Sequence, residues 1–280
     1  MAQDFDLELL RGRLRAQRFG DISNRVPALC IPGLSSNSRV FNRLGAQFER
    51  DGHPMVAFDL RGRGWSDITE KGTYGWENHA RDILEAADAM GIERFDYVGH
   101  SMGAFIGMAA VALDRGAHIR RLVLIDGLGV PAATALSAIL AGLVRLKNTF
   151  ATADEYVSAV REMGLAAPWN DLWEAHYRYD LITDNGNVRP RTDAAAVGED
   201  AVYGGTQDPR AIWPLLTVPT LLLRATVPLG DAPDAFVVTK ADYDDFLATV
   251  PTATGVEISA NHFGIMAAQE TLDAIERFLQ

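Results

Sequence analysis

The feature that most constrains the fold of this chain is the ten-residue stretch from Phe95 to Ala104, FDYVGHSMGA. Phe95–Val98 is typical of a short buried strand, the middle spells Gly-x-Ser-x-Gly, and a helical pattern begins at Met102. A strand that turns directly into a helix strains the residue between them and brings backbones into contact, so the flanking positions need glycine. The stretch therefore predicts a nucleophile elbow, with the Ser101 hydroxyl raised at the carboxyl end of a sheet beside free helix N–H groups.

A simpler interpretation of the same stretch is a glycine-rich turn whose serine caps the following helix. The order of strand, glycine-framed serine and helix favours the nucleophile.

Composition limits the partners that the chain can have. With 280 residues, of which 48% are apolar, it can bury the core of one large α/β domain with an insertion. A formal net charge of −11 offers little basic surface, which disfavours nucleic acid and anionic membranes as partners. The first residues lack the pattern of a secretory signal, and no run of about 18 apolar residues exists to span a membrane. We expect a cytoplasmic enzyme with a small-molecule substrate, and a homodimer is a possible assembly.

Apolar runs that alternate with helical periods predict a parallel sheet covered on both faces. An edge hairpin is expected over Leu7–Gly20. The predicted strands are Ala28–Pro32, Pro54–Asp59, Phe95–Val98, Arg120–Ile125, Val218–Ala225 and Gly255–Ser259, and the predicted helices are Phe41–Arg50, Tyr74–Met90, Met102–Arg115, Ala241–Val250 and Ile265–Leu279.

The strand signal disappears between Pro131 and Pro214, where residues 132–147, 154–164 and 169–181 have helical periods. This segment is far longer than an ordinary connection. We predict a core formed by residues 1–130 and 215–280, and an all-helical cap of residues 131–214 that covers the serine.

A serine needs a base to take its proton and a third group to orient that base. Among the six histidines, His262 follows the last predicted strand in ISANHFG, on a loop at the rim where the elbow opens. His100, directly before Ser101, points elsewhere and is expected to be a supporting residue. The sequence therefore predicts His262 as the general base.

Two acids compete to orient His262. Asp126 ends the strand Arg120–Ile125 at the same rim as Ser101. Asp231 lies in the loop TVPLGDAPD after Ala225, and it reaches His262 only if that loop bends back. The placement favours Asp126, and Asp231 remains the alternative.

An oxyanion hole needs two backbone donors. We expect one from Met102, after the nucleophile, and the other from Leu34, in the loop after the first buried strand. The sequence around Gly127 and Gly129 imitates a dinucleotide motif, but it contains Pro131 and lacks an acid about 20 residues further on. Side chains with metal-binding spacing are also missing. We expect neither a cofactor nor a metal.

With these residues together, the chain resembles the α/β-hydrolase superfamily over its whole length. The match rests on GHSMG and on the DLRG-x-G-x-S turn from Asp59 to Ser66. The resemblance implies an α/β-hydrolase fold, a mostly parallel eight-stranded sheet flanked by helices, with a helical cap inserted after strand 6. An acid at the position of Asp126 is similar to that of a smaller group, which includes (E)-2-(acetamidomethylene)succinate hydrolase and the cofactor-free quinaldine dioxygenases.

The resemblance to this smaller group also implies an anionic substrate. It identifies Arg189 and Arg224 as candidate anchors, through the similar segments NVRPR and LLLRA. The simpler interpretations are a solvated cap residue for Arg189 and a pair with a neighbouring acid for Arg224. The cap region contains five aromatic side chains that could contact a substrate: Trp169, Trp173, Tyr177, Tyr179 and Trp213. We expect one or two of them to face the substrate, with Trp169 and Tyr179 as the candidates.

Three functions fit these observations. The leading hypothesis is a serine hydrolase that cleaves a small carboxylic ester, lactone or amide through Ser101, His262 and Asp126. The alternative is a cofactor-free dioxygenase of an N-heteroaromatic substrate, in which the His–Asp pair acts as the base. A third is a ligand-binding receptor on a hydrolase scaffold. A haloalkane dehalogenase is disfavoured because its elbow nucleophile is a carboxylate.

Overall fold

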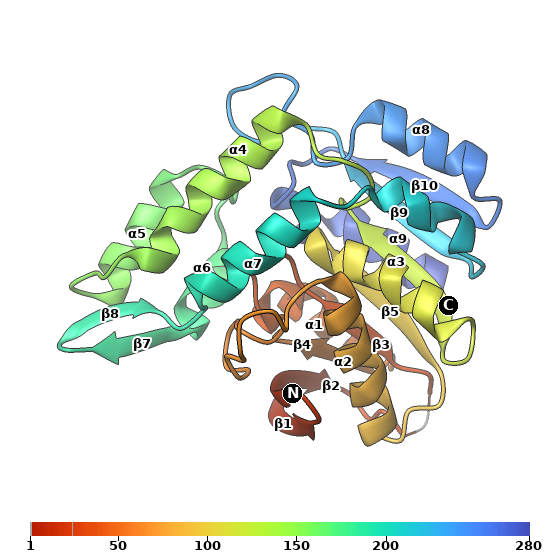
Figure 1. The fold of residues 1–280 in the computed structure, drawn as a ribbon, viewed down its shortest axis with the longest axis horizontal. Helices are drawn as coiled ribbons and strands as arrows, with labels where there is room; N and C mark the ends of the chain where they lie inside the picture. The colour runs from red at the N-terminus through yellow and green to blue at the C-terminus, as the bar shows by residue number, and fades with distance from the viewer. Residues whose placement is uncertain (1, 24) are drawn as a thin grey trace.

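The computed structural model describes residues 2–23 and 25–280, which form a central sheet between two layers of helices, with a cap beside the sheet's carboxyl edge (Figure 1). The sheet has eight strands in the order β1-β2-β4-β3-β5-β6-β9-β10. Their bounds are β1 Gln3–Leu9, β2 Gly12–Phe19, β3 Ala28–Ile31, β4 Met55–Phe58, β5 Phe95–His100, β6 Ile119–Ile125, β9 Thr220–Ala225 and β10 Ala253–Ile258.

Strand direction follows burial. β1 pairs with β2 and β2 with β4 in antiparallel fashion, whereas the other neighbours in the sheet run parallel. Every residue of β3, β4, β5 and β9 is buried, as expected of strands covered by helices on both faces. The edge strand β1 alternates between exposed and half-buried residues. The predicted mostly parallel eight-stranded sheet is confirmed.

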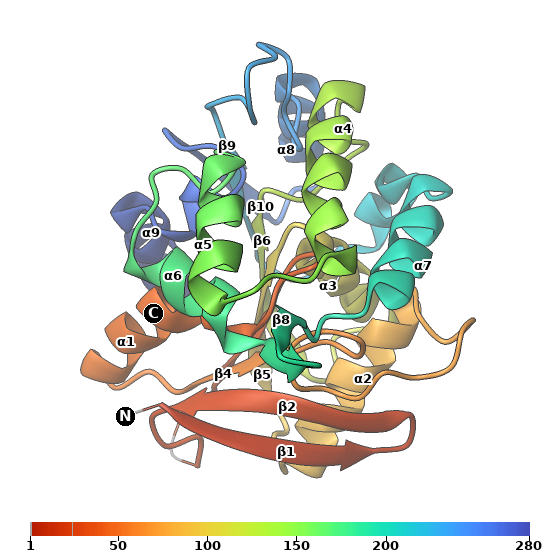
Figure 2. The ribbon, with the colours of Figure 1, turned by 90° about the vertical axis from the view of Figure 1, so that its left-hand side faces the viewer.

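Two sets of helices cover the faces of the sheet (Figure 2). The apolar side chains of α2 (Trp76–Ala89), α3 (Met102–Asp114) and α8 (Lys240–Thr249) share one buried cluster. Those of α1 (Asn42–Arg50) and α9 (Gln269–Leu279) belong to a cluster on the opposite face. The predicted terminal helix is divided into a short 3-10 turn, η4 (Gly264–Met266), followed by α9. The core therefore lies in two layers, one on each side of the sheet.

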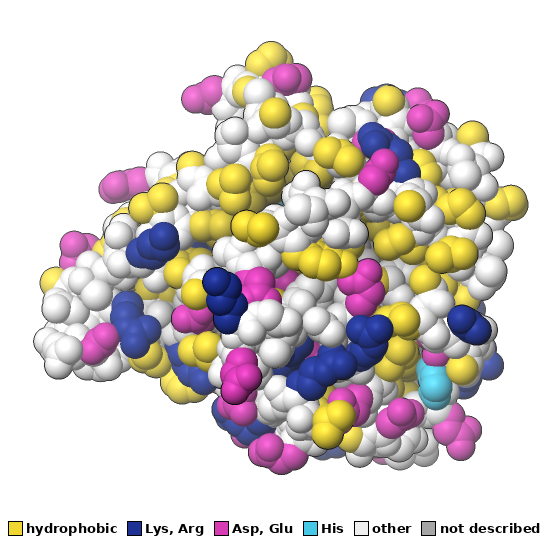
Figure 3. Space-filling view, in the orientation of Figure 1, with side chains coloured by type: hydrophobic (Ala, Val, Ile, Leu, Met, Phe, Trp, Pro, Cys, Tyr) yellow, Lys and Arg dark blue, Asp and Glu magenta, His cyan; other side chains and the backbone are white. Residues whose placement is uncertain are grey.

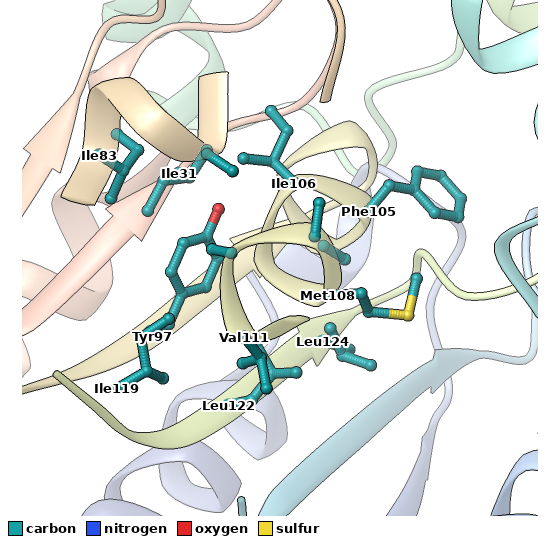
Figure 4. Close-up of a cluster of buried hydrophobic side chains, with 14 of the residues drawn as sticks. Ile31, Ile83, Tyr97, Phe105, Ile106, Met108, Val111, Ile119, Leu122 and Leu124 are labelled. Carbon is teal, nitrogen blue, oxygen red and sulfur yellow. The ribbon is translucent and has the colours of Figure 1, made fainter. Parts of the chain in front are cut away.

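Helix α3 packs unusually close to the sheet. Figure 4 shows side chains of α3, among them Ile106 and Met108, above Tyr97 of β5 and Leu124 of β6. At the start of the helix, a Cβ on Gly103 would lie 2.1 Å from the carbonyl oxygen of Ile31 in β3. Only glycine leaves room for this approach, so the second glycine of the Gly-x-Ser-x-Gly stretch sets the distance between helix and sheet.

The segment between β6 and β9 forms the cap. Its helices are α4 (Ala133–Gly142), α5 (Ala153–Glu162), α6 (Asp171–Tyr179) and α7 (Ala194–Gly205), with 3-10 turns η2 (Leu143–Lys147) and η3 (Pro209–Leu215). It also contains an antiparallel hairpin, β7 (Leu181–Asp184) and β8 (Asn187–Pro190). The prediction of an all-helical insertion is therefore wrong in this hairpin. Its turn is Asn185-Gly186, both with positive φ (50° and 83°), a common hairpin signal in sequence.

Buried charges join the cap to the core at the turn DLRGRGWSD. A nitrogen of the Arg63 guanidinium lies 2.6 Å from Oδ2 of Asp200 in α7, and both side chains are fully buried. His79 Nε2 lies 3.0 Å from the same carboxylate. On the other side of the turn, the Tyr179 hydroxyl donates to the buried Asp59 carboxylate at 3.0 Å. Separating the cap from the core would leave these charges unpaired, which is costly.

The outer side of α4 carries exposed apolar side chains. Leu136, Leu140 and, just beyond the helix, Val144 are 41%, 43% and 58% exposed, and Figure 3 shows hydrophobic side chains over this part of the cap. Ala135, in contrast, is fully buried against Leu229 and nearby residues of the loop after β9. The cap therefore meets the core through one side of α4.

Across the described residues, no helix has both the length and the apolar character needed to cross a bilayer.

The close approach at Gly103 predicts a large cost for even one added methyl group. Gly103→Ala should lower the free energy of unfolding by about 2–3 kcal/mol, because the helix must move away from Ile31. Chemical denaturation measures this change. The matched control is Gly198→Ala in the middle of α7, where no atom lies within 4 Å of the added Cβ and φ is not positive. That control should stabilise the protein by about 0.5–1 kcal/mol. Equal stability of Gly103→Ala and the natural protein would show that the contact is not tight.

Candidate active site

Ser101 lies in the tight turn between β5 and α3. Its backbone has φ 55° and ψ −120°, a conformation that non-glycine residues rarely adopt. The N–H of Ser101 donates to the carbonyl oxygen of Ile125 in β6 at 2.9 Å, which holds the turn in place. The strained residue of the predicted elbow is therefore present, at the carboxyl edge of the sheet.

The structure brings His262 and Asp126 to Ser101. His262 Nε2 is 3.0 Å from Ser101 Oγ, and His262 Nδ1 is 2.7 Å from Asp126 Oδ2. A carboxylate only accepts hydrogen bonds, so Nδ1 carries the proton and Nε2 is free to accept from the serine hydroxyl. His262 and Asp126 are 4% and 1% exposed, which shields both from water.

Asp126 follows directly after β6 and is held rigidly. Its second oxygen, Oδ1, accepts from the N–H of Ala225 in the neighbouring strand β9 at 2.9 Å. Its φ of 45° lies in the left-handed region, which aspartate tolerates better than most residues. Both carboxylate oxygens therefore have fixed donors, and the side chain is aimed at His262.

The alternative acid is not in the cluster. Asp231 and Asp234 are exposed on the loop after β9, whereas Leu229, Ala235 and Val237 of the same loop turn inward against the cap. The loop is committed to supporting α4. The carboxylate on His262 Nδ1 is that of Asp126.

The loop after β3 presents the backbone of Leu34 to the serine. A Cβ on Gly33 would lie 3.1 Å from Ser101 Cβ, so the loop passes directly over the nucleophile. Arg63 Nε donates to the Leu34 carbonyl oxygen at 2.9 Å, and the N–H of Ser38 donates to Asp59 Oδ1 at 2.7 Å. The turn DLRGRGWSD therefore fixes the Leu34 loop. Met102, the first residue of α3, has an N–H without an intrahelical acceptor.

A pocket opens above Ser101, between the core and the cap. The core contributes Ser101, His100, His262, Phe263 and the loop Gly33–Ser36, and the cap contributes Ile139, Arg145, Trp173, His176 and Tyr177. A neighbouring pocket shares Arg145 and Tyr177 and continues between α4 and α5 along apolar side chains. The core therefore supplies the larger part of the pocket wall, and the cap supplies the rest.

The sequence-based candidates for substrate contact lie elsewhere. Arg189 Nε donates to Asp184 within the β7–β8 hairpin at 2.7 Å and is 40% exposed. Arg224 pairs with Glu257 at 2.7 Å. Trp169 stacks on Tyr177, 5.8 Å between ring centroids, and Tyr179 donates to Asp59. In the described part of the chain, none of the four lines the pocket with Ser101. Of the five cap aromatics, Trp173 and Tyr177 do.

Arg145 is a pocket residue that sequence reasoning missed. It is 7% exposed, and its Nη2 donates to the carbonyl and hydroxyl oxygens of Ser35 at 3.2 and 3.1 Å. No carboxylate of the described residues lies within 4.0 Å of its guanidinium. Burial opposes its charge, but the Tyr156 and Tyr177 phenols and the Asp180 carboxyl keep the pKa of Arg145 above its usual value. Its signal in sequence was a lone cation that interrupts the apolar run 132–146.

The other basic side chain that the cap contributes to the pocket, His176, is uncharged at neutral pH. Burial, and then the nearby Arg145 cation, lower the pKa of His176 to about 3. Arg145 therefore supplies the positive charge of the pocket, and no acidic side chain is among the described residues that line it. Groups of metal-binding side chains are also missing from the residues that the structure describes.

Comparison with known proteins places the chain in a family. The model of the α/β-hydrolase fold matches residues 27–206, and the chain belongs to this family. The crystal structure of (E)-2-(acetamidomethylene)succinate hydrolase has the same fold, with a TM-score of 0.88, 24% identity, and coverage of 100% of this chain and 99% of that one.

Curated relatives match over shorter segments. A putative carbamate hydrolase, RutD, of Variovorax paradoxus is 36% identical over 89 residues, 32% of this chain and 33% of the relative. The N-formylmaleamate deformylase of Pseudomonas putida is 37% identical over 101 residues, 35% of this chain and 36% of the relative. The matched segments thus span about a third of the length of these two relatives. The chain therefore has hydrolases among its relatives.

The hydrogen bond between His262 and Asp126 predicts a distinct NMR signal. In protein with ¹⁵N-labelled histidine, the Nδ1–H proton of His262 should be strongly deshielded and slow to exchange, because it is buried and bonded to a carboxylate. Asp126→Ala should remove this resonance. Asp231→Ala, which alters an exposed side chain, should retain it. A resonance that survives Asp126→Ala would contradict the geometry.

Proposed function

We propose that this protein is a serine hydrolase that cleaves a small, carboxylate-bearing amide, carbamate or ester, lactones included. The observation that carries the proposal is the continuous hydrogen-bonded series from Ser101 Oγ through His262 to Asp126. Its order matches what an alcohol needs to become a nucleophile at neutral pH. The family membership of the chain supports the same reaction class.

In the proposed reaction, Ser101 Oγ attacks the substrate carbonyl while His262 Nε2 takes the hydroxyl proton. Asp126 holds the Nδ1–H tautomer and stabilises the imidazolium that forms. The carbonyl oxygen becomes an oxyanion and accepts from the N–H groups of Leu34 and Met102, a contribution of about 3–4 kcal/mol per donor. His262 then protonates the leaving amine or alcohol, which leaves an acyl-enzyme. Water, deprotonated by His262, releases the acid.

The names of the relatives extend the range of leaving groups. One is named as a carbamate hydrolase and another as a deformylase, so C–N bonds stand beside the C–O bonds of esters. The same triad serves both, because His262 protonates the leaving atom in either case. Because both of these relatives act on C–N bonds by name, we rank amides and carbamates above simple esters as the expected substrates.

Arg145 supports a substrate with a carboxylate. A buried guanidinium without a carboxylate partner is costly unless a ligand supplies one. The guanidinium has only neutral acceptors, Ser35 and the Tyr156 hydroxyl, and a carboxylate suits its forked donors better. Since Arg145 and Ser101 line one pocket, a substrate anchored at Arg145 presents its carbonyl to the nucleophile. Bond cleavage would then use a residue of the core, and anion binding a residue of the cap.

The catalytic assignment predicts distinct losses in three variants. Ser101→Ala should abolish labelling by a fluorophosphonate and hydrolysis of p-nitrophenyl acetate. Asp126→Asn should lower kcat by about 10⁴-fold, because the amide favours the wrong imidazole tautomer. Asp231→Asn should behave as the natural protein. Peptide mapping of the labelled protein identifies the modified residue.

Two results would overturn this assignment. Loss of turnover in Asp231→Asn alone would make that residue the acid. Full turnover in Ser101→Ala would exclude an acyl-enzyme. Turnover should also continue without dioxygen, which separates hydrolysis from the dioxygenase alternative.

The anion anchor predicts a change in substrate preference. A matched pair of substrates is mono-p-nitrophenyl succinate, which carries a carboxylate, and p-nitrophenyl pentanoate, which is neutral and of the same length. Arg145→Gln should raise KM for the succinate by about 10- to 100-fold, the worth of charge-assisted hydrogen bonds, and leave the neutral ester unchanged.

Arg189→Gln is the control, since Arg189 lies on the exposed hairpin. It should change neither substrate. Equal losses on both substrates in Arg145→Gln would mean that Arg145 only supports the loop at Ser35.

A further inference from the structure

His100 lies between Gly99 and Ser101, at the end of β5. The direction of its side chain follows from the alternation of side chains along the strand. Along β5, Phe95 and Tyr97 face the cluster that contains α2 and α3, whereas Val98 faces the cluster with α1 and α9. Successive side chains of a strand point to opposite faces, so His100 points the same way as Val98. The loop that carries His262 precedes α9 and lies on this face. His100 therefore points toward the loop that carries the base, and its ring also lines the pocket with Ser101.

The contact between the two histidines is a hydrogen bond to the main chain. His100 Nε2 lies 2.9 Å from the carbonyl oxygen of His262, and the two rings are 4.8 Å apart at an angle of 31°. A carbonyl oxygen only accepts, so Nε2 of His100 carries its proton and Nδ1 does not. The side chain is 3% exposed and its Nδ1 has no partner among the described residues. The donated bond from Nε2 is thus the polar contact that this buried ring makes.

His262 needs such a main-chain support. Its two ring nitrogens are committed to Ser101 and Asp126, and neither contact fixes the backbone from which the ring extends. On the other side, Asn261 Oδ1 accepts from the N–H of Phe263 and of Gly264, and Asn261 Nδ2 donates to Leu165 of the cap. His100 holds the intervening peptide from within the core.

We propose that His100 is a positioning residue that holds the main chain of His262, so that its imidazole stays within proton-transfer distance of Ser101. This inference rests on the proposed role of His262 as the base. A shift of about 1 Å in a catalytic group can reduce a rate by about 100-fold, which is the scale of the effect expected here.

Burial makes histidine suited to this place. Desolvation, and then the neighbouring His262, hold the pKa of His100 well below its usual range. The ring is therefore neutral when His262 becomes an imidazolium during the reaction. A permanently charged donor at residue 100 would repel that imidazolium, whereas neutral His100 donates without adding charge.

The test compares donors at residue 100. His100→Gln keeps an N–H donor at about the same reach, His100→Leu keeps the bulk without the donor, and His100→Asn has a donor that is one methylene too short. We expect His100→Leu and His100→Asn to lower kcat for p-nitrophenyl acetate on the order of 100-fold, with KM little changed. Labelling by the fluorophosphonate should slow in parallel. His100→Gln should restore most of both rates.

A readout independent of turnover is the His262 Nδ1–H resonance. It should broaden or shift in His100→Leu and return in His100→Gln. His53→Leu is the control, because His53 is also buried and stacks on Phe48 away from the site. It should change neither the rates nor the resonance.

Thermal melts identify any variant that fails to fold, and the short polar His100→Asn then replaces His100→Leu in the comparison. Equal losses in His100→Gln and His100→Asn would overturn the proposal, because an N–H donor at the right reach would then restore nothing. Unchanged rates in His100→Leu would overturn it as well. If instead the proposed hydrolase mechanism is wrong, Ser101→Ala keeps its turnover while the resonance still responds to residue 100.

Discussion

The active-site arrangement depends on one steric contact, the approach of helix α3 to strand β3. Gly103 lies so close to the Ile31 carbonyl that no side chain fits, and the turn before it holds Ser101 at a positive φ. This contact brings Ser101, the proposed nucleophile, to the same point as the first N–H of α3 and the loop after β3. A looser helix would let Ser101 relax into the helix and lower its hydroxyl. The strain is maintained because the surrounding sheet and helix are themselves tightly packed.

A second constraint is electrostatic, and it links the cap to the oxyanion loop. Arg63 pairs with Asp200 of the cap through one nitrogen and donates to the Leu34 carbonyl through another. One fully buried side chain therefore contacts both the cover of the site and the residue expected to stabilise the oxyanion. Such a buried pair contributes little net stability, but breaking it is expensive. Its effect is to favour one arrangement of cap and core, which also fixes the pocket between them.

The core of the site could be predicted because it follows the ends of strands. Ser101, Asp126 and His262 each come directly after a strand or in the loop that follows one, and parallel strands bring such residues to one rim. For the cap, no comparable rule predicts which side chains face the pocket. Whether Trp169 or Trp173 faces the pocket depends on which side of α6 turns inward, and the helical period alone does not say.

Arg189 lies outside the pocket with Ser101 for a local reason. The Asn185-Gly186 turn brings Asp184 beside it, so its partner lies five residues away and not in a ligand. Arg145 was hidden by its apolar neighbours, which indicated a buried helix without showing what the charge would meet. The contact of Arg189 follows from a hairpin signal that the expectation of an all-helical cap left unused, whereas no pattern in the sequence places Ser35 beside Arg145.

The position of the acid after β6 has a structural consequence for the cap. β6 lies beside β5 in the sheet, so Asp126 is next to the elbow without help from a long loop. Its Oδ1 even accepts from β9, the strand whose following loop holds the competing Asp231. The loop after β9 therefore does not have to supply the acid. Its residues Leu229, Ala235 and Val237 pack against Ala135 of α4. Helix α4 leads into the turn that contains Arg145. If the loop after β9 had to bring an acid to His262, it could not also pack against α4 and so support Arg145. Separating the two tasks allows the proposed catalytic acid, Asp126, and the proposed substrate anchor, Arg145, to be rigid together.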